Sequence, residues 1–304
     1  MISSASVRRR VRPRSSTWSV APPARVGFIL TTPMLIGIVA LVAYPLVSLV
    51  IVSLTSNSRY PGGLQNYITL FNSSADMRAL RTTLTVSALV TVASMTIGSI
   101  LAWVLVTARS RLVRAIVWLA TLTPFWMGVI VKNYAIMIVL APDGLINRAL
   151  ESIGLISKPI TLLNTIPAVV AGMLYTMIPW ATLPLYAVFR TIHLDLIHAA
   201  ESLGCYRAKA IVQIVPPLTL PGLLATSIIV YVYCIGFYIT PVLLGGITSP
   251  FVPSLIGLEV FNYFDLVGAS CAGVLLIVVA FLILGLGARL VGQQRLARAI
   301  ARSL

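Results

Sequence analysis

Six long apolar stretches divide this chain of 304 residues. They cover residues 27–53, 83–107, 115–140, 167–189, 221–245 and 269–291. Each is long enough to cross a bilayer, which requires about 20 helical residues. Because a polypeptide in lipid must satisfy its backbone hydrogen bonds internally, the pattern predicts an all-α integral membrane protein with six transmembrane helices.

The composition supports a membrane protein and excludes other classes. Hydrophobic residues make up 59% of the chain and charged residues 10%, whereas soluble domains carry roughly 25% charged residues. The net charge of +15 is also typical of nucleic-acid binding. A nucleic-acid-binding protein, however, gathers its basic residues on a polar domain, and here they lie in short segments between apolar stretches. We therefore expect contact with membrane lipid and none with nucleic acid.

The patterns of cysteine, histidine and glycine residues indicate no disulfide framework, metal site or ATP-binding loop. The three cysteines, Cys205, Cys234 and Cys271, form no CxxC pair, and only two histidines are present. This excludes a disulfide framework and argues against a metal site. No ATP-binding loop of the GxxxxGK[ST] type occurs. We expect a chain that binds no cofactor and does not hydrolyse ATP by that route.

The distribution of basic residues predicts the orientation in the membrane. Sixteen of them fall in the N-terminal tail, in the loops after the second and fourth stretches, and in the C-terminal tail counted together with Arg289 at the end of the sixth stretch; five fall in the other loops. Cytoplasmic loops carry the excess of Lys and Arg, so both termini are expected in the cytoplasm. The remaining basic residue, Lys132, lies inside the third stretch.

Both ends of the chain are basic tails. Residues 1–26 are rich in Ser, Pro and Arg, a composition that predicts disorder. The apolar stretch behind them is too long for the h-region of a signal peptide, roughly 7–15 residues, so the first helix is expected to be retained. The predicted organisation is a disordered cytoplasmic tail (1–26), a six-span transmembrane domain (27–291) and a basic cytoplasmic tail (292–304).

A polar segment, HAAESLGCYRAKAIVQIVPPLTLPG, occupies residues 198–222, between the fourth and fifth stretches. Residues 196–213 are good helix formers without proline, which predicts a short helix. Residues four apart share a helix face, so Ala200 and Gly204 would form one stripe of this helix and Ala199 and Leu203 the neighbouring one. The result would be a smooth face with small residues. Such a surface suits close approach by another protein, or it packs on the span ends as a plain connector.

Glycine and proline punctuate the same segment. Gly204 allows the chain to turn, and the adjacent prolines Pro216 and Pro217 are expected to stop any helix that follows. Pro221 would then begin the fifth span. The sequence thus predicts a helical hairpin on the cytoplasmic surface.

The hairpin resembles the EAA motif in the permeases of binding-protein-dependent ABC importers, which runs EAA, three residues, Gly, nine residues and I-x-L-P. Two positions depart from the motif: His198 stands where the family has Glu, and Pro216 where it has Leu. Glu201, one helical turn later, is a candidate substitute for the missing acid. In this family the hairpin is the coupling helix that inserts into a groove of the ATPase. The resemblance therefore implies an ATPase-docking site at His198, Ala199, Ala200, Glu201, Leu203, Gly204, Ile214 and Pro217.

Further motifs extend the resemblance over roughly residues 65–290. They are PFW at 124–126, KNYA at 132–135, GLIN at 144–147, MLYTMIPWATLPLYA at 173–187, PPLTLPG at 216–222 and LLGG at 243–246. They are similar to the permease branch that includes the spermidine/putrescine importers, in particular to the first permease of the pair. The resemblance implies the fold of a type I ABC importer permease.

Partners, location and solute follow from the same resemblance. It implies a second permease subunit, two ATP-binding subunits that hydrolyse the ATP, and a periplasmic or extracellular solute-binding protein. The chain would span the bacterial cytoplasmic (inner) membrane and move a small organic solute, polyamine or opine/amino-acid-like, by alternating access.

Three residues are candidates for the translocation pathway. Lys132 is the only charge inside a predicted span, and intramembrane charges are costly and often functional; alternatively it extends its ammonium group to the interface. Aromatic rings line a path for a cation or pack between helices and at the interface. Tyr238, beside the irregularity at Gly236 and Pro241, and Trp180 are the aromatic candidates.

Two acids, Glu259 and Asp265, fall in an external loop without Lys or Arg. They are candidates to receive the binding protein or to attract a cationic solute. The alternative is a solvated acidic loop without a specific role.

Two other functional classes are disfavoured by what the spans lack. An ion-coupled secondary transporter often needs carboxylates or histidines inside its spans, and every Asp, Glu and His here falls in a loop or at a span end. A membrane-embedded enzyme would need a constellation such as HExxH or paired intramembrane acids, and neither is present in the sequence.

Overall fold

The computed structural model describes the backbone of residues 24–192, 195–246 and 249–301. Nearly all of the predicted disordered tail, residues 1–23, lies outside the described residues. Within the part of the chain that is described, the secondary structure is helical and contains no strand. The predicted all-α class is confirmed.

The chain divides into two units, and each is described by itself. The first runs to Ser48 and the second from Leu49 to Leu304, so the boundary falls near the end of α1 (Ala24–Ser53). Within the first unit, α1 is apolar around its whole circumference, as a helix surrounded by lipid must be. The second unit contains the last turn of α1 and every later helix.

The second unit contains eleven further described helices and one π-helix. They are α2 (Gln65–Asn72), α3 (Ser74–Thr107), α4 (Arg111–Trp126), α5 (Val129–Leu140), α6 (Leu145–Ser152), α7 (Ile166–Phe189), α8 (Asp195–Ser202), α9 (Arg207–Ile235), α10 (Ile239–Gly245), α11 (Val252–Leu258), the π-helix η1 (Glu259–Tyr263) and α12 (Leu266–Ala301).

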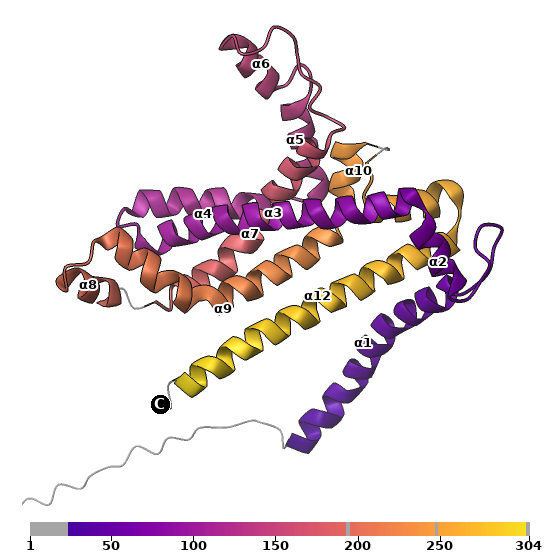
Figure 1. The fold of residues 1–304 in the computed structure, drawn as a ribbon, viewed down its shortest axis with the longest axis horizontal. Helices are drawn as coiled ribbons and strands as arrows, with labels where there is room; N and C mark the ends of the chain where they lie inside the picture. Colours follow the sequence, from indigo (N-terminus) through magenta and orange to yellow (C-terminus); the bar gives the residue numbers. More distant parts are fainter. Residues whose placement is uncertain (1–23, 193–194, 247–248, 302–304) are drawn as a thin grey trace, which may run out of the picture. The chain divides into compact units, whose positions relative to one another are not determined.

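The core of this unit lies between three long helices. α3, α7 and α9 run side by side (Figure 1), and α3 makes its most extensive contact with α7. Val90, Val169, Met173 and Val230, one or two from each helix, are completely buried there. α12 packs along α9. Because lipid is as apolar as these side chains, close packing and not the hydrophobic effect holds such helices together.

A glycine sets the closest approach of α3 and α7. A Cβ atom on Gly98 of α3 would lie 2.9 Å from the Cβ of Ala181 and 3.1 Å from the backbone nitrogen of Thr182 on α7. Small residues at helix crossings in membranes allow backbones to approach in this way. Gly98 therefore fixes the spacing of the main helix pair of the fold.

Side-chain caps mark the start of several long helices. The hydroxyls of Ser73, Ser110 and Thr165 accept hydrogen bonds from backbone N–H groups in the first turns of α3, α4 and α7. Each satisfies one of the amides that a helix start leaves without an internal partner. These polar residues also mark where the chain leaves and enters the apolar layer.

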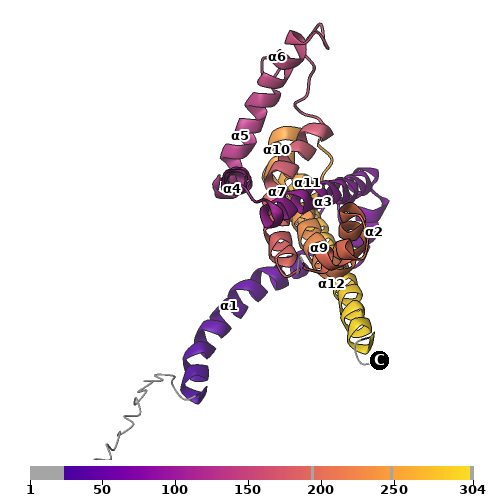
Figure 2. The ribbon, with the colours of Figure 1, turned by 90° about the vertical axis from the view of Figure 1, so that its left-hand side faces the viewer.

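The third predicted span, 115–140, is not one helix. The structure breaks it at Met127 and Gly128, whose backbones are extended, into α4 and α5. α5 and α6 extend away from the layer of α3, α7 and α9 (Figures 1 and 2). The periodicity of apolar residues continues across the break, which is why sequence alone did not reveal it.

The fifth predicted span, 221–245, has wrong boundaries, because Pro216 and Pro217 do not stop the helix. α9 begins at Arg207, passes through both prolines and Pro221, and ends at Ile235. Both proline side chains are exposed. The carbonyls that lose their N–H partners are those of Val212 and Gln213, both exposed residues in the first turns of α9, where other donors can reach them.

By length and composition, six helical segments of the described residues can cross a membrane. They are Thr32–Ser53, Ser74–Thr107, Val129–Ser152, Ile166–Phe189, Arg207–Ile235 and Leu266–Arg289. The predicted number of spans is confirmed. The second begins nine residues earlier than predicted, at Ser74 instead of 83, because its first turns carry the charges Asp76, Arg78 and Arg81 that a hydropathy reading leaves out.

Candidate functional site

The predicted hairpin is present, formed by α8, a short turn and the start of α9. Ile197 of α8 is 3% exposed and packs against Ala210 and Val215 of α9. This apolar contact anchors α8 on one side. The opposite side of α8 and the turn are open, and Leu203 is 89% exposed. The hairpin thus holds an apolar side chain at its tip where no described residue of this chain covers it.

Gly204 ends α8 in a closed turn. Its φ is +87°, the left-handed region that glycine adopts without strain. The N–H of Cys205 donates to the carbonyl of Ala200 (3.0 Å), and the N–H of Gly204 donates to that of Glu201 (2.9 Å). This pair of bonds is the Schellman arrangement of a helix C-terminus. The predicted turn at Gly204 is confirmed, but the short helix predicted over 196–213 is divided: α8 ends at Ser202 and a new helix begins at Arg207.

Glu201 joins the two arms of the hairpin. Its carboxylate lies 3.1 Å from Nδ1 of His198 and 3.7 Å from Nη1 of Arg207, the first residue of α9. The side chain of Glu201 is only 28% exposed. Its contacts are with the hairpin's own basic groups, whereas the side chain of His198 is 59% exposed. These contacts brace the turn that Gly204 closes.

The structure brings most of the predicted docking residues onto one exposed hairpin. His198, Ala199, Leu203, Gly204 and Pro217 are exposed; Ala200, Glu201 and Ile214 are half-buried. Ala200 and Ile214 pack around Ile197 and Ala210, inside the hairpin. The prediction missed Tyr206, which is 84% exposed and follows Leu203 by three residues. A lone aromatic residue in a polar loop between spans was the available signal.

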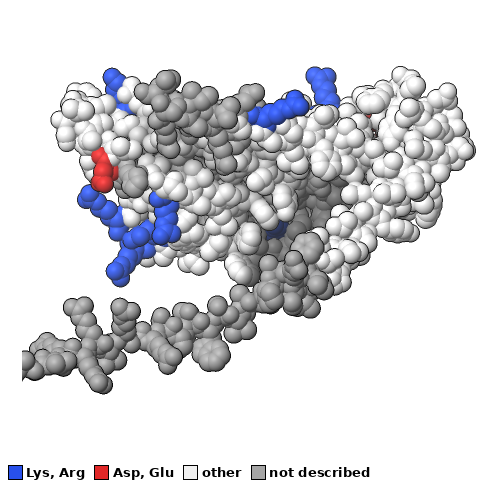
Figure 3. Space-filling view, turned by 90° about the horizontal axis from the view of Figure 1, so that it is seen from below, with Lys and Arg blue, Asp and Glu red and all other residues white. Residues whose placement is uncertain are grey.

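Exposed basic side chains surround the hairpin. Figure 3 shows them gathered at the end of the molecule where α8 lies. At this end α3 and α7 finish and α4 and α9 begin. The exposed basic residues there are Arg109, Arg111, Arg114, Arg190, Arg207 and Lys209. The two basic loops that the sequence analysis assigned to the cytoplasmic side, after the second and fourth stretches, therefore lie at the same end of the helices.

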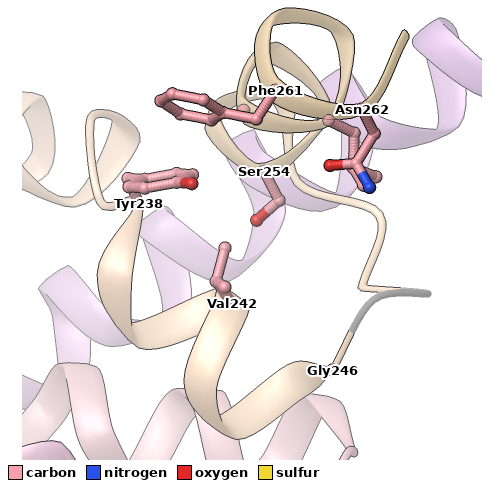
Figure 4. Close-up of a pocket in the computed structure, with 8 residues that line it drawn as sticks. Tyr238, Val242, Gly246, Ser254, Phe261 and Asn262 are labelled. Carbon is pink, nitrogen blue, oxygen red and sulfur yellow. The ribbon is translucent and has the colours of Figure 1, made fainter.

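A cavity of about 290 Å³ lies between α10, α11 and η1. The side chains of Tyr238, Val242, Ser254 and Phe261 surround it, with Asn262 at one side (Figure 4). Its described lining contains two aromatic rings and polar oxygen and nitrogen atoms, but no charged residue. The hydroxyl of Ser254 is buried and has no hydrogen-bond partner among the described residues. A buried hydroxyl without a partner is costly, so this cavity suits a ligand or water that supplies one.

The three pathway candidates do not meet. Tyr238 lies in the cavity wall, where its ring packs directly on Gly257. Trp180 lies in an aromatic stack, with ring centroids 4.7 Å from Tyr233 and 5.5 Å from Phe125. Among the described residues no hydrogen bond, ion pair or ring contact joins Trp180 or Lys132 to Tyr238.

Lys132 lies in the first turns of α5 and is 5% exposed. Within the described part of the chain its ammonium group has no carboxylate or hydrogen-bond partner, and its nitrogen is not among the buried polar atoms that lack one. The stem is covered and the charged tip reaches the surface, as in a lysine that snorkels. The position thus remains a candidate for contact with another molecule.

A charged cluster at the ends of the spans joins segments that are far apart in the sequence. The guanidinium of Arg59 lies 3.5 Å from Glu259 and 3.9 Å from Asp76. Glu259 is 6% exposed. The expectation of a solvated acidic loop is therefore wrong for Glu259, whose carboxylate is buried and paired with a residue 200 positions away. Asp265 is half-buried and accepts a hydrogen bond from Asn57 (2.7 Å).

We predict that Glu259 makes stability depend on pH. Burial, and then the charge of Asp76, raises its pKa to about 7 from 4.5, against the opposing effect of Arg59 and with a smaller contribution from Asp265. The folded protein therefore keeps this proton at pH values where the unfolded chain has lost it. Stability should fall as pH rises from about 4.5 to about 7, by up to roughly 3 kcal/mol.

Thermal unfolding of the detergent-extracted protein at pH 5 and pH 7.5 measures this dependence. Glu259→Gln keeps the shape of the side chain but cannot titrate, so its unfolding temperature should change less between the two pH values. The nearby groups Arg59, Tyr60, Asp76, Asp265 and Cys271 are unchanged in this variant. An identical pH dependence in both proteins would show that Glu259 is not the titrating group.

The geometry defines a class: a helical membrane protein with six spans, an exposed hairpin beside basic loops and a cavity between short helices. The model of the family described as "Binding-protein-dependent transport system inner membrane component" matches residues 94–296. This covers about two thirds of the chain, which belongs to that family and is a permease of an ABC importer.

Two curated relatives illustrate the similarity. The spermidine/putrescine transport system permease protein PotB of Escherichia coli K12 is 28% identical over 222 residues, 73% of this chain and 80% of that protein. The inner membrane ABC transporter permease protein YdcU of the same organism is 31% identical over 194 residues, 60% of this chain and 61% of YdcU. The resemblance to spermidine/putrescine-type permeases is thus confirmed.

A solved structure, that of a bacterial alginate ABC transporter in complex with an alginate pentasaccharide-bound periplasmic protein, shares the fold. One of its chains matches 87% of this chain, and 93% of itself, with a TM-score of 0.76 and 19% identity. At this identity the match shows the fold alone, and it agrees with the predicted type I importer fold. The family description gives an inner membrane component, and the six candidate spans of the described residues make it a multi-pass one.

Proposed function

We propose that this chain is one of two permease subunits of an ATP-driven importer, with an ATPase subunit docked on the hairpin of α8 and α9. The observation that carries the proposal is the exposed tip: Leu203 and Tyr206 are 89% and 84% exposed, outside the apolar spans. Large apolar side chains exposed to water on a braced support are typical of protein interfaces. On this proposal the partner subunit, and not this chain, binds and hydrolyses ATP.

The orientation follows from the same proposal. The exposed basic residues around the hairpin favour a cytoplasmic location for that end of the helices. Both termini are then cytoplasmic, and the cavity at Tyr238 faces outward or lies near the outer interface. A periplasmic solute-binding protein would deliver solute on that side, as the complex of the alginate transporter with its periplasmic protein suggests.

We propose a polyamine-like organic cation as the solute. The name of the relative PotB supports this class. The cavity agrees with it, since the rings of Tyr238 and Phe261 offer π-faces to an ammonium group and the hydroxyl of Ser254 can accept a hydrogen bond. Tyr238 is the proposed solute contact; Trp180 and Lys132 remain predicted pathway residues without a contact to it.

The test is affinity purification of the C-terminally tagged chain from its host in mild detergent, followed by mass spectrometry. The proposal expects an ATP-binding subunit and a second permease to copurify. It also expects spermidine-loaded binding protein to stimulate ATP hydrolysis. A chain that purifies alone, and whose transport survives ATP depletion, would instead support the ion-coupled alternative.

Leu203→Asp tests the docking surface directly. The side chain is exposed, so the substitution should cost the fold less than about 0.5 kcal/mol. Placing a charge in an apolar contact should lower the affinity for the ATPase by roughly tenfold or more. Copurification of the ATPase with each variant is the measurement.

The matched control is Gln65→Glu, which adds the same charge at an exposed position of α2, outside the hairpin. It should leave copurification unchanged. Equal amounts of ATPase with Leu203→Asp and with the control would place the docking surface elsewhere.

A further inference from the structure

The charged cluster of Arg59, Asp76 and Glu259 is close in sequence, through Glu259, to residues that line the cavity. Glu259 is the first residue of η1, and the same five-residue π-helix contains Phe261 and Asn262 of the cavity lining. A contact at Glu259 therefore constrains the position of the cavity wall two and three residues later. π-helical turns often occur at functional sites.

The segment that supplies Arg59 is an ordered external loop, residues 54–64. The side-chain oxygen of Asn57 accepts hydrogen bonds from the backbone N–H groups of Arg59 and Tyr60 (2.9 and 2.7 Å). The amide of Asn66 donates to the carbonyls of Ser53 and Thr55 (2.9 and 2.8 Å). Hydrogen bonds made by Asn57 of the loop and Asn66 of α2 therefore fix the loop backbone. This fixes the position from which the side chain of Arg59 extends.

A close approach joins this loop to the start of α12. A Cβ on Gly268 would lie 2.9 Å from the ring of Tyr60, 3.0 Å from the carboxylate of Asp265 and 3.1 Å from that of Glu259. Tyr60 is 1% exposed. Only a residue without a side chain lets the loop ring and the two carboxylates converge here.

The cluster holds more acid than base. Glu259 and Asp76 face one guanidinium, and the Oε2 atom of Glu259 and the Oδ2 atom of Asp76 are buried without a hydrogen bond among the described residues. The side chain of Arg59 is 49% exposed. A molecule outside can therefore reach the guanidinium of Arg59. Both carboxylates have their ion pair with this one group.

We propose that Arg59 is a positioning residue for solute transfer. Its contact with Glu259 fixes the position of η1 relative to the loop 54–64. Because η1 carries Phe261 and Asn262, this contact also fixes one wall of the cavity at Tyr238. The importance of the cavity for solute rests on the proposed function. The coupling between loop and wall rests on the geometry alone. Contact of an external partner with the loop would then alter the cavity.

Cysteine labelling tests the coupling in the full-length chain, extracted in mild detergent with the subunits that accompany it. Asn262→Cys places a thiol in the exposed cavity lining, while the native Cys205 in the hairpin is partly exposed and serves as the internal reference. Cys234 and Cys271 are buried. Labelling with N-ethylmaleimide is followed at each cysteine by peptide mass spectrometry.

Arg59→Gln should change the labelling rate of the thiol introduced at position 262, relative to Cys205, by at least about fivefold, because Glu259 then loses the guanidinium group that holds it. Arg59→Lys should restore most of the original rate. Arg78→Gln, an exposed arginine on α3 without an ion pair in the described structure, is the matched control and should have no effect.

A double-mutant cycle distinguishes loss of the Arg59–Glu259 contact from a general loss of structure. If Arg59 acts through Glu259, the effect of Arg59→Gln should be largely absent when Glu259→Gln is already present. Additive effects of the two changes would overturn the proposal. So would an unchanged labelling rate at the introduced thiol, or a parallel rise at that thiol and at Cys205.

The outcome does not depend on transport. Failure of the ATPase to copurify would contradict the proposed function. The labelling rates would still show whether Arg59 controls the cavity wall. Conversely, a normal complex with uncoupled labelling would contradict only the role of Arg59. In the intact importer, Arg59→Gln should then lower the transport rate at limiting concentrations of solute-loaded binding protein, whereas Arg78→Gln should not.

Discussion

Replacement of Gly204 by arginine is expected to abolish copurification of the ATPase while the chain still inserts into the membrane. The space around the Cβ position of Gly204 is empty, so an arginine side chain would project from the tip of the hairpin. It would place bulk and charge on the surface that we propose for docking. A loss on the order of 3 kcal/mol lowers association by roughly a hundredfold, which detergent purification would register as absence.

The conformation of Gly204 contributes a second, separable effect. At φ +87° a residue with a side chain is strained by about 1–2 kcal/mol, and asparagine is the residue that tolerates this region best. Gly204→Asn should therefore keep most of the docking, Gly204→Ala should lose part of it, and Gly204→Arg should lose it all. The amount of extracted chain, equal in the three variants, controls for insertion. Normal ATPase recovery with arginine would exclude the hairpin as the docking site.

Replacement of Gly98 by leucine is expected to prevent accumulation of the folded chain. Even one Cβ atom at this position would meet Ala181 and the backbone of Thr182 at 2.9–3.1 Å, and backbone cannot move aside as a flexible side chain does. α3 and α7 would have to separate, opening the core around Val90 and Met173. Overpacking costs about 1–3 kcal/mol for a few methylene groups, and a larger effect is expected here.

Gly285→Leu is the matched control for this variant. A Cβ at Gly285 of α12 meets nothing within 4 Å, so the same change in size should leave the yield and the unfolding temperature of the extracted protein nearly unchanged. Gly98→Ala should be intermediate. Similar yields for the leucine variants at 98 and 285 would show that α3 and α7 are not packed as closely as the structure indicates.

The apolar pattern was sufficient to predict the fold class, the number of spans and the place of the hairpin. Each of these depends on local composition, which hydropathy measures directly. The fourth span shows the best case: 167–189 was predicted and Ile166–Phe189 is observed, because Thr165 and Pro167 mark its start. Gly204 was also recognised as a turn, since glycine is the residue that a left-handed helix end requires.

The errors arose where the outcome depends on three-dimensional context. Pro216 and Pro217 were expected to end a helix, yet they lie on the exposed side of α9, and the carbonyls that they leave without N–H partners belong to the exposed residues Val212 and Gln213. Glu259 was expected in a solvated acidic loop, because its partner Arg59 is 200 residues away in the sequence. No local pattern connects two such residues. The cavity at Tyr238 was anticipated only as an irregularity at Gly236 and Pro241.

The unbroken course of α9 has a mechanical consequence. Its 29 residues have a length along the helix of about 43 Å, with the turn at Gly204 just before one end and Tyr238 just beyond the other. The hairpin and the cavity wall are therefore joined by one helix, with no loop between them. A displacement of the hairpin would reach Tyr238 through hydrogen-bonded backbone, and Pro216, Pro217 and Pro221 are the points at which this helix can bend.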